Sequence, residues 1–178
     1  LELHGPGPVH RHIMSSIRNT NYFEVGLVHP KVRTTHSPVY LGYNDDLDAI
    51  DSNGNVFATG ISQEDDFPTT SGAYDTTGGT GQDMIVVKFS SDLGSLLGST
   101  YLGASGNEYP RGFEIDSSGN IFTASTGWSP YPTTSGSYQP TYSGDDAVGN
   151  SGDVAISKLS NDLTTLVAST FVGGVSAD

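Results

Sequence analysis

The sequence contains no cysteine, so neither a disulfide bond nor a thiolate metal site can form. Basic residues are scarce, with seven Lys and Arg against twenty Asp and Glu, a formal net charge of −13. Because phosphate binding needs clustered Lys and Arg, this balance excludes a nucleic-acid partner. No run of about 18 apolar residues occurs, so we expect no membrane insertion.

Glycine is abundant, with 23 among 178 residues, while hydrophobic residues make up only 34 %. Long stretches with helical periodicity are absent, and short β-branched and aromatic runs are separated by Gly, Asn, Asp and Ser. This composition predicts an all-β fold of short strands joined by turns.

One segment occurs twice. The first copy begins at Asp51 with Asp-Ser-Asn-Gly-Asn-Val-Phe, and the second begins at Asp116 with Asp-Ser-Ser-Gly-Asn-Ile-Phe. Each continues to a Pro-Thr-Thr-Ser-Gly-x-Tyr segment, at Pro68 and Pro132 respectively, so the period is 65 residues by one marker and 64 by the other. A near-constant period of this size predicts a repeat architecture.

The start of each copy has the chemistry of a turn, because Asp and Asn bond nearby backbone and Gly adopts positive φ. An EF-hand calcium loop is the alternative interpretation, but Gly stands fourth rather than sixth and no Glu occupies the twelfth position. We therefore predict a turn motif formed by Asp51, Gly54, Asn55, Asp116, Gly119 and Asn120.

These motifs, with the Val-Val-Lys-Phe strand and the Ser-Thr-Tyr-Leu-Gly segment that follow, resemble the SBBP β-propeller repeat over roughly residues 38–175. That repeat is found mainly in large bacterial and archaeal surface or secreted proteins. The resemblance implies one antiparallel four-stranded blade per repeat and an extracellular or cell-surface location. It implies no particular activity.

We divide the chain into an extended Gly/Pro/His arm (1–21), a half blade of two strands (22–42), blade repeat 1 (43–103) and blade repeat 2 (104–178). The predicted strands lie near 47–51, 55–62, 83–90 and 95–102 in the first blade, and near 110–116, 120–127, 153–160 and 165–173 in the second.

Two and a half blades do not close a ring, which typically needs four to eight. We expect either a piece of a longer protein, since the chain opens with Leu1 rather than Met, or association between copies into a ring or filament. The expected partners are therefore other copies or adjacent blades of a longer chain.

Candidate metal ligands are His10 with His12, which share one side of an extended segment, and the acidic loop pair Asp145 and Asp146. Solvated side chains are the alternative interpretation for both pairs. We expect no cofactor; the candidate ion is Ca²⁺ at the acidic loops and a borderline metal such as Zn²⁺, Ni²⁺ or Cu²⁺ at the histidine pair.

Four aromatic residues, Trp128, Tyr131, Tyr138 and Tyr142, lie on the long loop between the second and third strands of blade 2. Exposed rings can stack on a glycan or a partner protein. Phe67 and Tyr74 are the counterparts of Tyr131 and Tyr138 in blade 1, so packing is the alternative for these two. Trp128 and Tyr142 have no counterpart and are the better candidates for contact.

The sequence contains no Gly-x-Ser-x-Gly, His-Glu-x-x-His or P-loop motif, so we predict no catalytic residue and no enzyme. The leading prediction is a non-catalytic extracellular structural or adhesive protein that self-associates through blade edges. The alternative is a glycan- or protein-binding fragment of a longer propeller. A glycoside-active propeller comes third. It needs two carboxylates about 5–10 Å apart across a cleft, and no Asp or Glu in the sequence stands out for that role.

Overall fold

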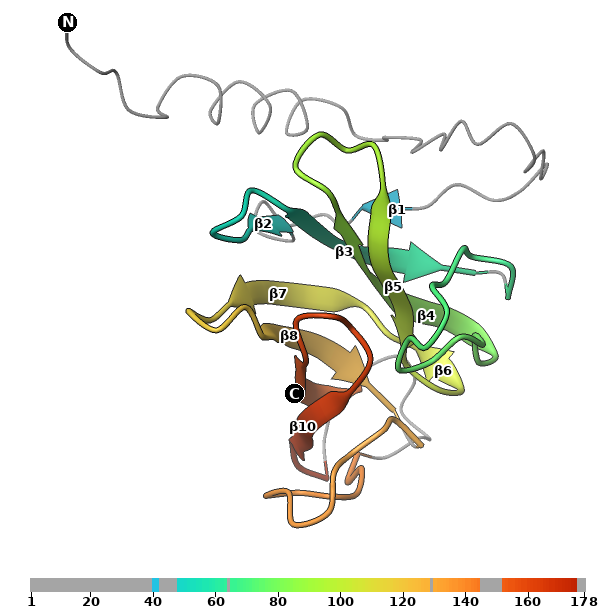
Figure 1. The fold of residues 1–178 in the computed structure, drawn as a ribbon. Coiled ribbons are helices and arrows are strands. Elements are labelled where there is room, and N and C mark those ends of the chain that lie inside the picture. Colours follow the sequence, from blue (N-terminus) through green and yellow to red (C-terminus); the bar gives the residue numbers. More distant parts are fainter. Residues whose placement is uncertain (1–39, 42–47, 64, 129, 145–151, 176–178) are drawn as a thin grey trace, which may run out of the picture.

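The computed structural model describes residues 40–41, 48–63, 65–128, 130–144 and 152–175, which form ten β-strands (Figure 1). No helix in these ranges is long and apolar enough to cross a membrane. The strands are β1 (Tyr40–Leu41), β2 (Asp48–Ile50), β3 (Val56–Ser62), β4 (Gly81–Phe89), β5 (Leu96–Leu102), β6 (Gly106–Asn107), β7 (Pro110–Ile115), β8 (Ile121–Gly127), β9 (Asp153–Leu159) and β10 (Leu166–Val172).

Two four-stranded antiparallel blades follow one another along the chain. In the first, β2 pairs with β3, β3 with β4 and β4 with β5, and in the second β7 to β10 pair in the same manner. Equivalent residues hold equivalent registers, for example Phe57 opposite Lys88 and Phe122 opposite Lys158. The predicted all-β fold of propeller-type blades is confirmed, and the described residues do not close into a ring.

Two short strands extend the first blade. Strand β6 pairs in parallel with the start of β4, and β1 pairs with Ile61 and Gly60 of β3, next to the three residues that β2 covers. We had predicted residues 40–41 as the end of a separate half blade. The structure instead pairs them with the end of β3, whose backbone groups the short β2 does not reach. The rest of that half blade and the arm lie outside the described residues.

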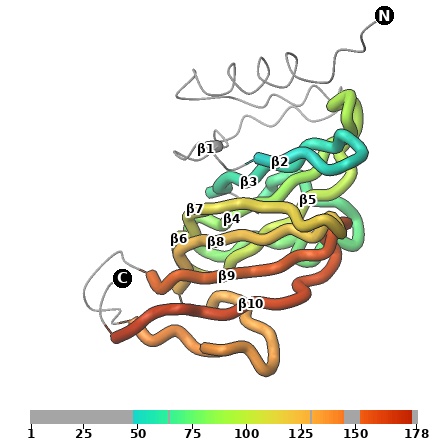
Figure 2. The backbone as a smooth tube through the Cα atoms, turned by 90° about the vertical axis from the view of Figure 1, so that its left-hand side faces the viewer, coloured from blue at the N-terminus to red at the C-terminus, as the bar shows by residue number. Residues whose placement is uncertain are grey.

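The two blades stack face to face (Figure 2). Burial alternates along β9, so one face of the second blade is turned toward the first blade and the other is not. The buried cluster is continuous across the blades. It comprises Phe57, Met84, Val86 and Leu102 from the first blade and Phe113, Ile121, Tyr131, Ala155, Leu159, Leu163 and Phe171 from the second.

Candidate functional site

The repeated turn motif has the same hydrogen bonds in both copies. Asp51 Oδ1 accepts from the backbone N–H groups of Asn53 and Asn55, both at 2.9 Å, and Oδ2 accepts from Asn55 Nδ2 at 2.9 Å. Asp116 accepts the equivalent three bonds from Ser118 and Asn120. The glycine of each turn has a positive φ, 80° at Gly54 and 79° at Gly119.

A lysine from the third strand of each blade faces the turn carboxylate. Lys88 Nζ lies 3.6 Å from Asp51 Oδ2, and Lys158 Nζ lies 3.3 Å from Asp116 Oδ2. The hydrogen bond from the Asn120 side chain is the main cause that lowers the pKa of Asp116 to about 2. At Asp51, burial raises the pKa. The hydrogen bonds from Asn55 and Asn53 and the charge of Lys88 outweigh burial, so the pKa of Asp51 lies below its ordinary value. A cation at either carboxylate would have to displace these donors.

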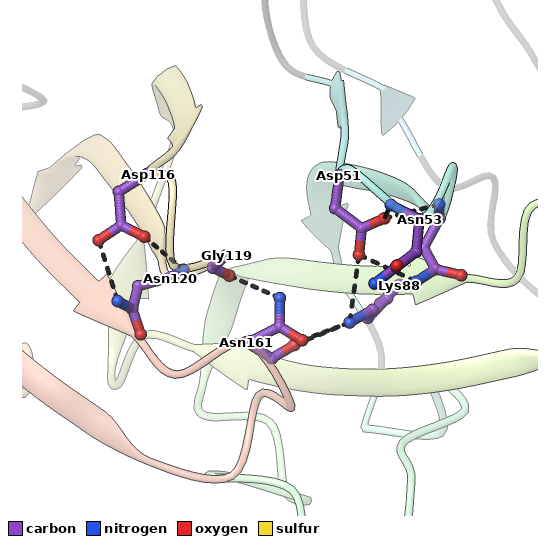
Figure 3. Close-up of polar contacts among 8 residues, drawn as sticks. Asp51, Asn53, Lys88, Asp116, Gly119, Asn120 and Asn161 are labelled. Atoms are coloured by element: carbon purple, nitrogen blue, oxygen red, sulfur yellow. Dashed lines mark hydrogen bonds and ion pairs between the residues drawn. The ribbon is translucent and has the colours of Figure 1, made fainter.

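The first turn and the second are joined across the blades by Asn161 (Figure 3). Lys88 Nζ donates to Asn161 Oδ1 at 2.6 Å, and Asn161 Nδ2 donates to the carbonyl oxygen of Gly119 at 2.8 Å. One amide thus fixes the position of β4 in the first blade relative to the turn of the second. Lys88 also lies 4.8 Å above the ring of Phe57, which adds a cation–π contact.

Two residues further on, Leu163 inserts into the first blade. Its side chain is fully buried, and its carbonyl oxygen accepts a hydrogen bond from the N–H of Tyr74 at 2.8 Å. A Cβ placed on Gly98 would lie 3.2 Å from Leu163 Cδ1, so a side chain here would make a tight contact that the glycine avoids. Leu163 has a φ of 60°, which is costly for a leucine. Its burial in the neighbouring blade offsets that cost. We call the Ser160–Thr165 turn with Leu163 the plug.

The second blade repeats the surface that receives the plug, but nothing in the described part of the chain covers it. In the first blade Phe57, Met84, Val86 and Leu102 are 0 % exposed. Their equivalents in the second blade are 37–44 % exposed: Phe122, Val154, Ile156 and Val172. Phe122 and Ile156 line a groove of about 470 Å³ whose other walls are residues 134–138, 157–158 and 167–170. We call this surface the open face.

Tyr131 belongs to the core. It is 3 % exposed, its hydroxyl lies 2.9 Å from Ser157 Oγ, and its ring centroid is 5.9 Å from that of Phe171. Burial raises its pKa to about 12. This corrects the expectation that Tyr131 offers a ring to a ligand, because a ring enclosed by the core has no free face.

The other three predicted aromatic residues are dispersed. Tyr142 packs on the core with its ring 5.9 Å from Phe171, and Trp128 lies edge-on to Tyr109 at 6.5 Å. Tyr138 is 86 % exposed and, alone of the four, lines the groove of the open face. Trp128 and Tyr142, the two favoured candidates for contact, therefore pack within the blade, while Tyr138, which has a counterpart in Tyr74, faces solvent.

The predicted metal ligands His10, His12, Asp145 and Asp146 lie outside the described residues. Within the described ranges, no group of three or more His, Cys, Asp or Glu side chains is placed to hold a metal ion.

Sequence reasoning missed a buried acidic pair. Glu108 is fully buried just before β7; its Oε2 accepts from the N–H of Ala104 at 3.3 Å, and its Oε1 has no hydrogen-bond partner in the described part of the chain. A Cβ on Gly103 would collide with both Glu108 Oε2 and Asp83 Oδ1, so the two carboxyl groups converge there. Burial, with a smaller contribution from the Asp83 charge, raises the pKa of Glu108 to about 7.

The plug was also missed, although the sequence contains a signal for it. Ser-x-Asp-Leu occurs only at 90–93 and 160–163, a spacing of 70 residues that matches the later strands of the repeat. Glu108 follows Asn107 as Asp45 follows Asn44 in the first copy, but an acidic residue before a strand does not by itself predict burial.

Comparison with known proteins gives one family match. Residues 98–132 match the model of the SBBP beta-propeller repeat, a span that runs from β5 through the Asp116 turn to the loop after β8. No curated protein matches the chain.

Proposed function

We propose that this chain, which carries an SBBP beta-propeller repeat, is a non-catalytic structural or adhesive protein that associates with other copies through the faces of its blades. We further propose that it acts outside the cell or at the cell surface, as the resemblance to surface and secreted repeat proteins implies. The observation that carries the proposal is the open face, which exposes four apolar side chains whose equivalents one blade earlier are fully buried.

The physical argument is the apolar area that the open face leaves in water. At about 25 cal/mol per Å² of apolar surface, covering four large side chains that are each about two-fifths exposed contributes about 1–2 kcal/mol per side chain. Repeat units that cannot bury their faces alone are stabilised by a neighbouring unit. A further blade, supplied by another copy, fits this surface better than a small ligand because the surface is broad and shallow.

The experiment is sedimentation velocity of the purified chain over a concentration series from about 1 to 500 µM. We expect the weight-average sedimentation coefficient to rise with concentration, because face-to-face association follows mass action. A coefficient that stays at the monomer value throughout the series would contradict the proposal.

A second candidate function is binding of a glycan or protein at the groove, and Tyr138 is the observation that favours it. This ring is 86 % exposed beside the groove and is suited to stacking on a sugar. Glycan-array screening of the wild-type chain and of Tyr138→Ala tests it. Binding that the variant loses would support this function.

A further inference from the structure

We infer that the open face of one copy receives the turn Ser90–Ser95 of a second copy, with Leu93 as the inserted side chain. The inference rests on the proposed self-association and names the two surfaces that meet. It follows from a joint that the structure already contains, because the plug of the second blade is seated in the first.

The turn Ser90–Ser95 is a second plug that is not seated. Leu93 has a φ of 57°, close to the 60° of Leu163. Ser90 Oγ donates to Asp92 Oδ1 at 2.6 Å, as Ser160 Oγ does to Asp162 Oδ1 at 2.6 Å. The difference is exposure, since Leu163 is 0 % exposed and Leu93 is 57 % exposed. A leucine held at positive φ in water has the cost of that conformation without the burial that offsets it.

The open face has the groups that hold a plug. Lys158 lies 4.8 Å above the ring of Phe122, as Lys88 lies 4.8 Å above the ring of Phe57. The Lys158 ammonium therefore has the same position in its blade as the Lys88 ammonium, which binds Asn161. Tyr138 stands where Tyr74 stands, and its backbone N–H has no acceptor in the described part of the chain. In the first blade that N–H binds the carbonyl oxygen of the plug leucine.

The unseated plug and the open face lie at opposite ends of the stack. Leu163 points from the second blade into the first, so Leu93, one blade earlier, points away from the second blade, and the turn between β4 and β5 projects from that end in Figure 1. The turn Ser90–Ser95 of one copy therefore cannot reach the open face of the same copy, and each contact between copies is head to tail. Such contacts close a ring or continue as a filament.

Two positions make the joint between copies weaker than the joint within the chain. Ser91 replaces Asn161, so the amide that links the lysine to the turn is missing. Ala168 stands where the first blade has Gly98. A Cβ on Gly98 would lie 3.2 Å from Leu163 Cδ1, so the methyl group of Ala168 makes the fit of an inserted Leu93 tighter. These two differences predict reversible association, and they supply variants that should strengthen it.

The test is sedimentation velocity of the full chain and five variants. Leu93→Asn removes the apolar side chain, while Asn still accepts positive φ. Ala168→Glu fills the exposed groove opposite Lys158. Each should weaken association by roughly tenfold or more, because the burial of one leucine is lost. Ser91→Asn and Ala168→Gly should strengthen it. Val175→Asn is the matched control, since Val175 is exposed and lies outside both surfaces.

The decisive arm mixes Leu93→Asn with Ala168→Glu. The first variant keeps an intact open face, and the second keeps Leu93 in the turn Ser90–Ser95. An equimolar mixture should therefore form one-to-one dimers and nothing larger. If the mixture stays monomeric, the two surfaces do not bind each other and the inference is overturned. If all variants associate like the wild type, the inference is overturned while the proposed function stands through another surface. If the wild type never associates, both fail.

Discussion

Glu108→Gln tests the physical consequence of burying a carboxyl group between the blades. Burial raises the pKa of Glu108 from its ordinary 4.5 to about 7, with a smaller contribution from the charge of Asp83. The folded chain therefore binds this proton more tightly than the unfolded chain does. The free energy of unfolding falls as pH rises from about 4.5 through about 7, and the loss is complete above that range.

The magnitude follows from the two pKa values. At about 1.4 kcal/mol per pH unit, the interval from 4.5 to about 7 corresponds to about 3 kcal/mol. For a chain of this length that is roughly 6–12 °C in melting temperature. Gln keeps the shape of Glu and cannot ionise, so we expect the variant to match the wild type near pH 4.5 and to exceed its stability by up to this amount at pH 8.

Urea denaturation followed by circular dichroism at pH 4.5, 6, 7 and 8 provides the measurement. The control is Glu114→Gln on β7, the same substitution at an exposed carboxyl, which separates the effect of burial from the effect of removing a charge. A small slope should remain in Glu108→Gln, because burial also raises the pKa of Asp83. If the variant keeps the full wild-type slope, or is less stable than the wild type at pH 8, the pH dependence does not come from Glu108 and the reasoning is wrong.

Three further predictions concern the turns and the plug. Leu163→Ala should lower the free energy of unfolding by about 2–5 kcal/mol, because a fully buried leucine leaves a cavity between the blades; urea titration measures this. Asp51→Ala should lower the free energy of unfolding by about 1 kcal/mol through lost turn hydrogen bonds, equally with and without EDTA. A melting temperature that EDTA lowers only in the wild type would indicate a bound metal instead. Asp116→Ala should be less stable than the wild type above pH 4, and the difference should vanish as pH falls through about 2, where Asp116 gains its proton; melting curves from pH 2 to 7 would contradict this if the difference stayed constant.

The blades could be predicted closely because their signals are local. Asp-x-x-Gly-Asn fixes a turn from within five residues, and the period-2 alternation that follows it fixes a strand. The predicted ranges 55–62 and 120–127 therefore agree with β3 and β8 to within one residue. Tertiary structure adds little information at such positions.

The site could not be predicted in the same way, because exposure is decided by the neighbour and not by the local sequence. Leu93 and Leu163 share a motif and a backbone conformation, yet one is in water and the other is buried. Tyr131 is enclosed by Phe171 and Ser157, which lie at least 26 residues away in the sequence. Its membership of a long loop suggested a contact residue, and only the position of β9 and β10 shows otherwise.

The joint between the blades also determines geometry beyond a single chain. The contacts of Lys88 with Asn161 and of Tyr74 with Leu163 hold the blades at separate points, so they set one angle and one offset between neighbours. An object that repeats a fixed rotation and a fixed translation is a helix, and it becomes a circle when the translation is zero. In an assembly of such chains, curvature and pitch would depend on this joint within each chain together with the joint between copies. A substitution at Asn161 would then change the shape of the assembly without changing the fold of any blade.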